Sequence, residues 1–176
     1  MNRLLSRTTP GEATVSFTYT ATGKLHTMTD ASGITTYNYD KMDRLTSKAT
    51  PERTLNYTYD TAGNLASIAS SNANGASMSY TYDSLNRLSS VTDRLGTSNY
   101  TYDGASNVST VTYPNGVQTD YQQYDAMNRI LQMATQNSGY IYQRGPTGNL
   151  TSVTEQNGRA VQWSFDGLTP RLHAAR

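Results

Sequence analysis

Alternation of aromatic and small polar residues dominates the chain. In Tyr80-Thr81-Tyr82 the two rings lie two residues apart, so in a strand both face one side and Thr81 faces the other. Asp83 follows, and after a short turn-forming segment Leu88 begins a second alternating segment. No segment has helical periodicity over two turns, so the pattern predicts short β-strands joined by turns.

The same phrase recurs along the whole chain. Two aromatic residues separated by one residue, and usually Asp, are followed by Gly or Asn, then Arg or Asn, then an aliphatic residue. The second aromatic residue recurs every 18 to 23 residues, at Tyr19, Tyr39, Tyr59, Tyr82, Tyr102, Tyr124, Tyr142 and Phe165. Such a near-constant period is typical of stacked units that bury their apolar faces only against neighbouring units.

Each repeat is predicted to contain two strands and two turns. The Asp at the end of the first strand can accept hydrogen bonds from backbone N–H groups two or three residues later, which closes a turn. Asp43, Gly63 and Asn86 share one position in this turn, and their residue types tolerate a left-handed backbone, so we expect φ > 0 there. A second turn is expected at pairs such as Asn115-Gly116. The predicted fold is therefore all-β, a curved sheet of tandem antiparallel hairpins, one for each repeat of about 20 residues.

Three departures from regularity carry their own predictions. Leu88 and Val91 are separated by an odd number of residues, so either Leu88 belongs to the turn or a bulge intervenes. The tyrosines of Tyr121-Gln122-Gln123-Tyr124 are three apart, which predicts a bulge. After Tyr142, Gln143 stands in place of Asp, and residues 144–147 are expected to lengthen the turn.

The recurring residues are the expected structural anchors of the repeats. They are Tyr19, Tyr37, Tyr39, Asp40, Tyr57, Tyr59, Asp60, Gly63, Tyr80, Tyr82, Asp83, Tyr100, Tyr102, Asp103, Tyr124, Asp125, Tyr140, Tyr142, Phe165 and Asp166.

Composition supports an ordered chain without obvious chemistry. Leu, Ile, Val and Phe make up only about 15% of the residues, but the net charge is +1 and 14 tyrosines can replace aliphatic residues in a half-hydrated interior. Near-neutral charge argues against a nucleic-acid partner or an anionic membrane surface. The chain has no cysteine, which excludes disulfides and thiolate metal sites, and no apolar run long enough to cross a membrane.

The candidate chemical groups are better explained by structure than by catalysis. Each recurring Asp occupies the same place in its repeat, so neighbouring carboxylates would lie about 10 Å apart, too far for a nucleophile pair. Calcium would need more oxygen ligands than one such turn offers. His26 and His173, the only histidines, lie at opposite ends of the array. We therefore expect no enzyme activity, no metal and no cofactor.

The repeated phrase resembles the YD repeat, also called the RHS repeat, from about Asn2 to about Leu172. Tyr82-Asp83-Ser84-Leu85-Asn86-Arg87-Leu88 carries the resemblance most clearly. The family includes bacterial RHS and wall-associated proteins, the C component of insecticidal toxin complexes, and teneurins. The resemblance implies a spiralling β-sheet that forms a hollow shell, enclosing in bacterial members a toxin that is released by an autoproteolytic aspartyl segment. It also implies an extracellular or cell-surface location.

The chain departs from the family pattern in length and in content. It has about eight repeats over residues 1–176, incomplete at both ends, and it carries neither the family's cleavage segment nor a toxin-like domain. We therefore expect a fragment of a longer array, a noncatalytic segment whose partners are adjoining repeats and a toxin cargo. The ends of such a fragment would expose sheet edges, which predicts self-association.

A carbohydrate- or cell-surface-binding module is the alternative function. Exposed aromatic rings can stack on sugars, although the regular tyrosine pairs are equally explained as cross-strand ladders that stabilise the sheet. Trp163, the only tryptophan, interrupts the tyrosine pattern and is the weak candidate for a ligand-binding residue.

Overall fold

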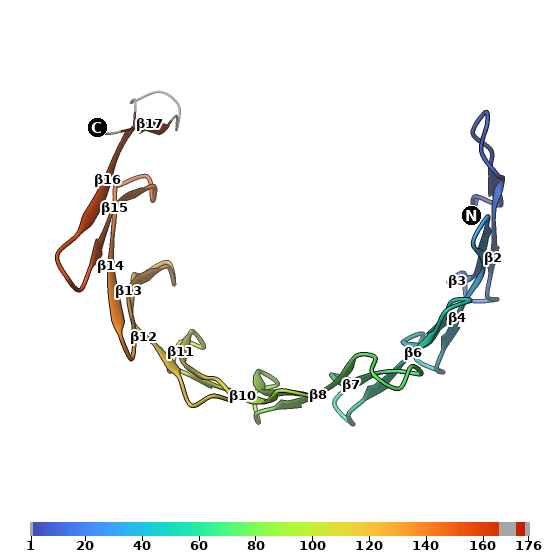
Figure 1. The fold of residues 1–176 in the computed structure, drawn as a ribbon, viewed down its shortest axis with the longest axis horizontal. Coiled ribbons are helices and arrows are strands. Elements are labelled where there is room, and N and C mark those ends of the chain that lie inside the picture. Colours follow the sequence, from blue (N-terminus) through green and yellow to red (C-terminus); the bar gives the residue numbers. More distant parts are fainter. Residues whose placement is uncertain (1, 166–171, 175–176) are drawn as a thin grey trace. The chain divides into compact units, whose positions relative to one another are not determined.

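The computed structural model describes residues 2–165 and the backbone of residues 172–174, and in this part of the chain every regular element is a β-strand. Neighbouring strands pair antiparallel in chain order within each of two compact units, residues 1–95 and 96–176 (Figure 1). The first unit contains β1 (Ser6–Arg7), β2 (Val15–Tyr19), β3 (Leu25–Asp30), β4 (Gly33–Tyr39), β5 (Leu45–Ala49), β6 (Thr54–Tyr59), β7 (Leu65–Ser70), β8 (Ser77–Tyr82) and β9 (Leu88–Asp93). The second contains β10 (Gly96–Tyr102), β11 (Val108–Thr112), β12 (Gln118–Tyr124), β13 (Ile130–Thr135), β14 (Ser138–Arg144), β15 (Leu150–Glu155), β16 (Ala160–Phe165) and β17 (Leu172–Ala174).

The prediction of an all-β fold built from hairpins is confirmed. Strands β8 and β9, for example, are the two halves of the repeat that begins at Tyr80, and they pair antiparallel across the turn that starts at Asp83. Strand β8 also pairs with β7, the second strand of the preceding hairpin in the same unit. The turns that follow the aromatic pairs therefore gather at one edge of each sheet, and the remaining turns lie at the other edge.

The sheet has one half-buried face and one hydroxyl-rich face. Along β8, Met78, Tyr80 and Tyr82 are half-buried, whereas the intervening side chains are exposed. On the half-buried face Tyr80 lies opposite Val91, as Tyr57 lies opposite Ile68. Cross-strand pairs of this kind stabilise a sheet, which accounts for the even spacing of the rings.

On the opposite face, hydroxyl groups of neighbouring strands are paired by hydrogen bonds. Hydrogen bonds of 2.6 Å join Thr18 to Thr27, Thr58 to Ser67 and Thr81 to Ser90. These pairs lie in the same place of successive hairpins, so the small polar residues of the repeat also have a cross-strand function.

The tyrosine-rich face takes the place of a conventional core. Among the described residues Val111 is the only buried apolar residue, and no side chain is completely enclosed. A single layer of strands encloses neither of its faces, so the aromatic side chains remain half-buried, as Tyr80 and Tyr82 do. This arrangement explains how a chain so poor in aliphatic residues forms ordered structure.

A bulge follows the turn in the hairpins β2–β3, β4–β5, β6–β7, β8–β9, β10–β11, β12–β13 and β14–β15. Tyr82 pairs with Leu88, but the preceding Thr81 pairs with Ser90, so Ser89 is the extra residue. The bulge therefore explains the odd separation of Leu88 and Val91, and it decides between the two alternatives left by the sequence. The bulge predicted between Tyr121 and Tyr124 is also present, because Tyr121 pairs with Met133 and Gln123 with Gln132.

The expected alignment of the repeat around Tyr142 is wrong. Tyr142 pairs with Val153, the arrangement that Tyr80 has with Val91, so Tyr142 takes the first aromatic position and not the second. Arg144 takes the second position, opposite Leu150, and Gly145 stands where other repeats have Asp. The intervals on either side become 20 and 21 residues in place of 18 and 23.

The turn after Arg144 is also not lengthened, contrary to expectation. The Gly145 N–H donates to the Asn149 carbonyl at 2.9 Å and the Gly148 N–H to the Gly145 carbonyl at 2.8 Å. The same pair of backbone bonds closes the turn from Asp60 to Asn64. The hydrogen-bonded frame of the turn therefore survives the loss of Asp.

Candidate functional site: the aspartyl turns

The most regular feature of the chain is a five-residue segment that we call the aspartyl turn, with Asp40–Arg44 as the example. The Asp40 N–H donates to the Arg44 carbonyl at 2.9 Å, and the Asp43 N–H donates to the Asp40 carbonyl at 3.0 Å. The equivalent turns at the same edge are Thr20–Lys24, Asp60–Asn64, Asp83–Arg87, Asp103–Asn107, Asp125–Arg129 and Gly145–Asn149, and the same pair of backbone bonds closes Tyr113–Val117 and Glu155–Arg159 at the other edge. Positions one to five refer below to this segment.

The carboxylate at position one organises the turn. Asp40 Oδ1 accepts the backbone N–H of Met42 at 2.8 Å and that of Arg44 at 3.0 Å. Its Oδ2 accepts from Arg44 Nε at 2.7 Å, and Arg44 Nη2 lies 2.7 Å from the same oxygen. The donors are thus two and four residues later, which corrects the expectation of two or three.

Hydrogen bonding depresses the pKa of these carboxyl groups. The backbone N–H at position five is the largest cause for Asp40, Asp83 and Asp125, and the Asn64 side-chain amide is the largest cause for Asp60. Each carboxylate is ionised at neutral pH, with its oxygens directed to donors in its own turn. A general acid or base would instead need a pKa near the working pH, so this environment favours turn formation over proton transfer.

Position four adopts a left-handed backbone, as predicted. The φ angle is 59° at Asp43, 95° at Gly63 and 58° at Asn86. Ser106, at 67°, has the same conformation although serine is not among the residue types that favour it.

Five tyrosines in the second aromatic position each connect their repeat to the repeat before it. The Tyr39 hydroxyl donates to the Leu25 carbonyl at 2.8 Å, and the Tyr59 hydroxyl to the Leu45 carbonyl at 2.9 Å. The corresponding bonds are Tyr19 to Leu4, Tyr82 to Leu65 and Tyr124 to Val108. Burial raises the pKa of Tyr39, Tyr82 and Tyr124, so these hydroxyls keep the proton that they donate. The acceptor is in each case the aliphatic residue that follows the previous turn.

Arginines of one repeat lie against the tyrosine of the next. Arg44 Cζ is 4.4 Å from the centre of the Tyr59 ring, and Arg3 Cζ is 5.2 Å from that of Tyr19. For Arg44, the cation–π attraction adds to its bond with Asp40 of its own turn. Sequence reasoning missed these contacts, because they join residues of different repeats.

The repeat of Arg144 lacks these connections. Tyr142 donates its hydroxyl to Met133 Sδ at 3.1 Å and not to a carbonyl. Arg144 Nη1 donates to the Gly148 carbonyl at 3.2 Å, but its buried Nε has no hydrogen-bond partner among the described residues. This repeat is therefore the least satisfied of those that the structure describes.

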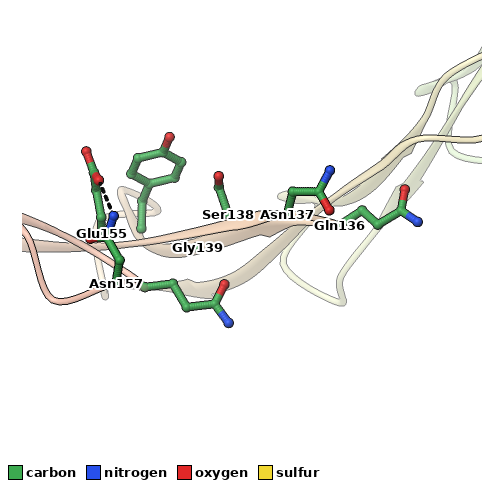
Figure 2. Close-up of a pocket in the computed structure, with 8 residues that line it drawn as sticks. Gln136, Asn137, Ser138, Gly139, Glu155 and Asn157 are labelled. Carbon is green, nitrogen blue, oxygen red and sulfur yellow. Dashed lines mark hydrogen bonds between the residues drawn. The ribbon is translucent and has the colours of Figure 1, made fainter.

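A shallow cavity of about 360 Å³ lies at the other edge of the second unit (Figure 2). Gln136, Asn137, Tyr140, Glu155 and Asn157 contribute to its lining, from the β13–β14 and β15–β16 turns and the adjoining strands. Asn157 Nδ2 donates to Glu155 Oε2 at 3.1 Å. The combination of one ring with amide and carboxylate groups offers a polar, partly aromatic surface.

Trp163 lies in β16, two residues before Phe165, and so takes the first aromatic position of its repeat. Its side chain is half-buried, and its backbone lies opposite Ala174 of β17. Asp166 lies outside the described residues. His26 Nδ1 is 3.2 Å from the Tyr37 carbonyl, which is a contact with the backbone.

The described residues include no cluster of three His, Cys, Asp or Glu side chains that could hold a metal ion. In the same part of the chain, none of the elements is a helix with the length and hydropathy needed to span a bilayer.

A comparison with known protein families identifies the same repeated segments. The RHS repeat model matches residues 19–55, 59–98, 82–118 and 102–141, which together cover more than half of the chain. The chain belongs to the RHS repeat family. No curated protein matches it in sequence.

Solved structures share the fold at low sequence identity. The crystal structure of TcdB2-TccC3 aligns over 91% of this chain with a TM-score of 0.73 and 19% identity. The crystal structure of TcdB2-TccC3 without its hypervariable C-terminal region aligns over 92%, with a TM-score of 0.72 and 20% identity. The Photorhabdus luminescens Tc holotoxin pore aligns over 92%, with a TM-score of 0.72 and 19% identity. This RHS chain spans about a tenth of the length of each of those chains.

Proposed function

We propose that this chain is a noncatalytic wall segment of a longer, secreted or cell-surface RHS-type protein, and that the wall belongs to a shell around a toxin cargo. The observation that carries the proposal is the serial connection of the repeats, in which five tyrosines in the second aromatic position each donate to a backbone carbonyl of the preceding repeat, as Tyr59 does to Leu45. Such a chain of local contacts extends a sheet without needing a separate core. The similarity to segments of toxin-complex structures supports a wall that continues beyond this segment.

The principal partners under this proposal are the adjoining repeats and the enclosed cargo. The near-neutral charge of the segment fits a wall that attracts neither nucleic acid nor an anionic membrane. Taken alone, the segment is proposed to self-associate, because an end strand such as β1 has backbone groups available for pairing with another chain.

Limited proteolysis of the parent polypeptide tests the shell. In the intact parent, the segment that follows the repeats should resist protease, and negative-stain electron microscopy should show closed hollow particles. Deleting one whole repeat, residues 40–59, should open the wall and make that segment sensitive. The matched control is Ser84→Ala, an exposed substitution in an aspartyl turn that should leave protection intact. Equal sensitivity in the intact parent and the deletion would refute enclosure.

A carbohydrate-binding function is the second candidate, favoured by the cavity near Tyr140 and Glu155. A ring that stacks on a sugar, with amide and carboxylate groups around it, is a suitable surface for hydroxyl-rich ligands. A glycan array with the purified chain separates the candidates. Binding that Tyr140→Ala or Trp163→Ala abolishes, and Tyr113→Ala leaves unchanged, would favour this candidate; an array without signals favours the wall.

A further inference from the structure

From Asp40 to Asn149, turns of two kinds alternate along the chain. Turns of the first kind end in Arg and have Asp or Asn at position four, namely Asp43-Arg44, Asn86-Arg87 and Asn128-Arg129. Turns of the second kind end in Asn and have Gly or Ser at position four, namely Gly63-Asn64, Ser106-Asn107 and Gly148-Asn149. The kind of turn therefore returns only every second repeat, after 42 or 43 residues. A period of two repeats indicates that some contact between neighbouring turns differs from one repeat to the next.

The arginine turns reach the left-handed residue of the following turn. Arg44 uses Nε and Nη2 for Asp40, so Nη1 is directed away from its own carboxylate. Nη1 lies 3.7 Å from the place that a Cβ would occupy at Gly63. The contact at Arg129 is closer, because a Cβ at Gly148 would collide with the Arg129 Nη1 atom.

The N-terminal arginine repeats this geometry. Arg3 Nη1 lies 3.1 Å from the place of a Cβ at Gly23, and its guanidinium lies over Tyr19. At Gly23 and Gly148 the guanidinium would have to move to admit a Cβ, whereas at Gly63 a Cβ would lie in ordinary contact with the guanidinium and the atoms of a longer side chain would compete with it for space. An arginine turn thus favours a small residue at position four of the turn that follows it.

The asparagine turns make the opposite demand. Asn64 Nδ2 donates to Asp60 Oδ2 of its own turn at 3.0 Å and to Asn86 Oδ1 of the following turn at 3.1 Å. Asn107 does the same, with Asp103 Oδ2 at 3.0 Å and Asn128 Oδ1 at 3.2 Å. The amide uses both of its hydrogens, one within its turn and one across to the next turn. The next turn must therefore carry an acceptor side chain at position four.

Asn and Asp satisfy both demands of that position. They supply the acceptor oxygen, and they are the non-glycine residues that most readily adopt a left-handed backbone. Asp43 shows that the acceptor is used even after an irregular turn, because Thr22 Oγ1 donates to Asp43 Oδ1 at 2.8 Å.

We propose that position five of one turn and position four of the next form a pairing code at this edge of the sheet. An arginine turn accepts a successor with Gly or Ser at position four, and an asparagine turn accepts one with Asn or Asp. The building block of the wall is then a pair of repeats. The partner that fits either end is a further RHS-type repeat of the complementary kind, whether it comes from this chain or from another. The code stands independently of the shell and its cargo.

A double-mutant cycle in the full chain tests the code. Arg44→Asn converts the first turn to the asparagine kind, and Gly63→Asn gives the second turn the matching acceptor. Either change alone breaks the match, and together they restore it. Urea unfolding gives the folding equilibrium constant of each variant. If the two substitutions acted independently, the double variant would change this constant by the product of the two single-variant factors. We expect the constant of the double variant to be at least about fivefold higher than that product gives, since residues in contact couple.

Gly116→Asn is the matched control, because Gly116 has φ 79° and its Cβ would meet no atom within 4 Å. Its effect on stability is that of replacing a left-handed glycine that no arginine side chain contacts. Gly63→Asn should destabilise more than Gly116→Asn, and Gly116→Asn should combine with Arg44→Asn without coupling. If Gly63→Asn alone prevents folding, recovery of the folded state in the double variant supports the code. An additive cycle at positions 44 and 63, or a double variant that also fails to fold, overturns it.

Discussion

The hydroxyl of Tyr59 donates a 2.9 Å hydrogen bond to the backbone carbonyl of Leu45, and this contact joins one repeat to its predecessor. Leu45 is itself opposite Tyr39, immediately before the bulge, so its carbonyl is available to the next repeat. The bulge and the tyrosine are therefore parts of the same connection. The repeat that contains Tyr39 and Leu45 therefore contributes the donor for one such contact, from Tyr39 to Leu25, and the acceptor for another, from Tyr59 to Leu45.

Removal of the Tyr59 hydroxyl should show how much its hydrogen bond to Leu45 contributes to the stability of the chain. We expect Tyr59→Phe to destabilise the chain by about 1 kcal/mol, because the Leu45 carbonyl loses its donor while the ring remains. Thermal unfolding followed by circular dichroism should show a Tm lower by about 2–4 °C. Tyr57→Phe is the control in the same strand, since no hydrogen bond joins the Tyr57 hydroxyl to another described residue. Equal losses for the two variants would contradict this role for the Tyr59 hydroxyl.

The left-handed position should be more sensitive to substitution than the rest of its turn. We expect Gly63→Ala to cost about 1–2 kcal/mol, because a side chain with a Cβ is strained at positive φ, and Gly63 has φ 95°. Gly104 is the matched control, since it occupies position two of an aspartyl turn and its Cβ would meet no atom within 4 Å. Urea unfolding of Gly104→Ala should show no loss of stability. A similar loss in both variants would contradict the left-handed requirement.

Most of the fold could be predicted from the sequence, because the strands and turns of each repeat depend on residues that are close together in the chain. The spacing of Tyr80 and Tyr82 predicts a strand with both rings on one side, Asp83 predicts the turn, and Asn86 predicts the left-handed residue within it. The spacing of Leu88 and Val91 indicated the bulge as one of two alternatives. These features depend only on residues within one hairpin, where the sequence separation is short.

The contacts between repeats could not be predicted in the same way. The position of Arg44 over Tyr59 depends on the distance between two turns that are adjacent only in space. The error at Tyr142 has a different cause, because the alignment followed residue type and not distance from the turn. Gly148-Asn149-Leu150 repeats the spacing of Gly63-Asn64-Leu65, and counting back from it would have placed Arg144 in the second aromatic position.

The irregular repeat should be improved by restoring the tyrosine. Arg144→Tyr removes a buried Nε that has no hydrogen-bond partner among the described residues. By analogy with Tyr124 and Val108, the new hydroxyl is expected to donate to the Ile130 carbonyl. The gain should be about 1 kcal/mol, as for other substitutions toward a family pattern, and thermal unfolding measures it. Arg159→Tyr, at an exposed position, is the control and should change the Tm little. A lower Tm for Arg144→Tyr would show that the arginine stabilises its repeat.

Stability should fall at acid pH because of the aspartyl turns. The pKa of Asp40, Asp60, Asp83 and Asp125 is lower in the folded chain than the ordinary value of 3.8. As the pH falls through 3.8, the unfolded chain therefore binds protons before the folded chain does. The stabilisation from these carboxylates is present above 3.8 and is lost progressively as the pH approaches their folded values.

Thermal unfolding between pH 7 and pH 3 should show this dependence and locate its source. Asp60→Asn should lower the Tm at pH 7 and reduce the further loss on acidification, because one group with a depressed pKa has been removed. The Asn64 backbone N–H can still donate to the side-chain oxygen at position 60, so the turn keeps part of its frame. Glu12→Gln, an exposed change outside the turns, is the control and should leave the acid dependence as it is. If Asp60→Asn and the unmodified chain lose stability equally between pH 5 and pH 3, the carboxylate of this turn does not contribute to acid unfolding.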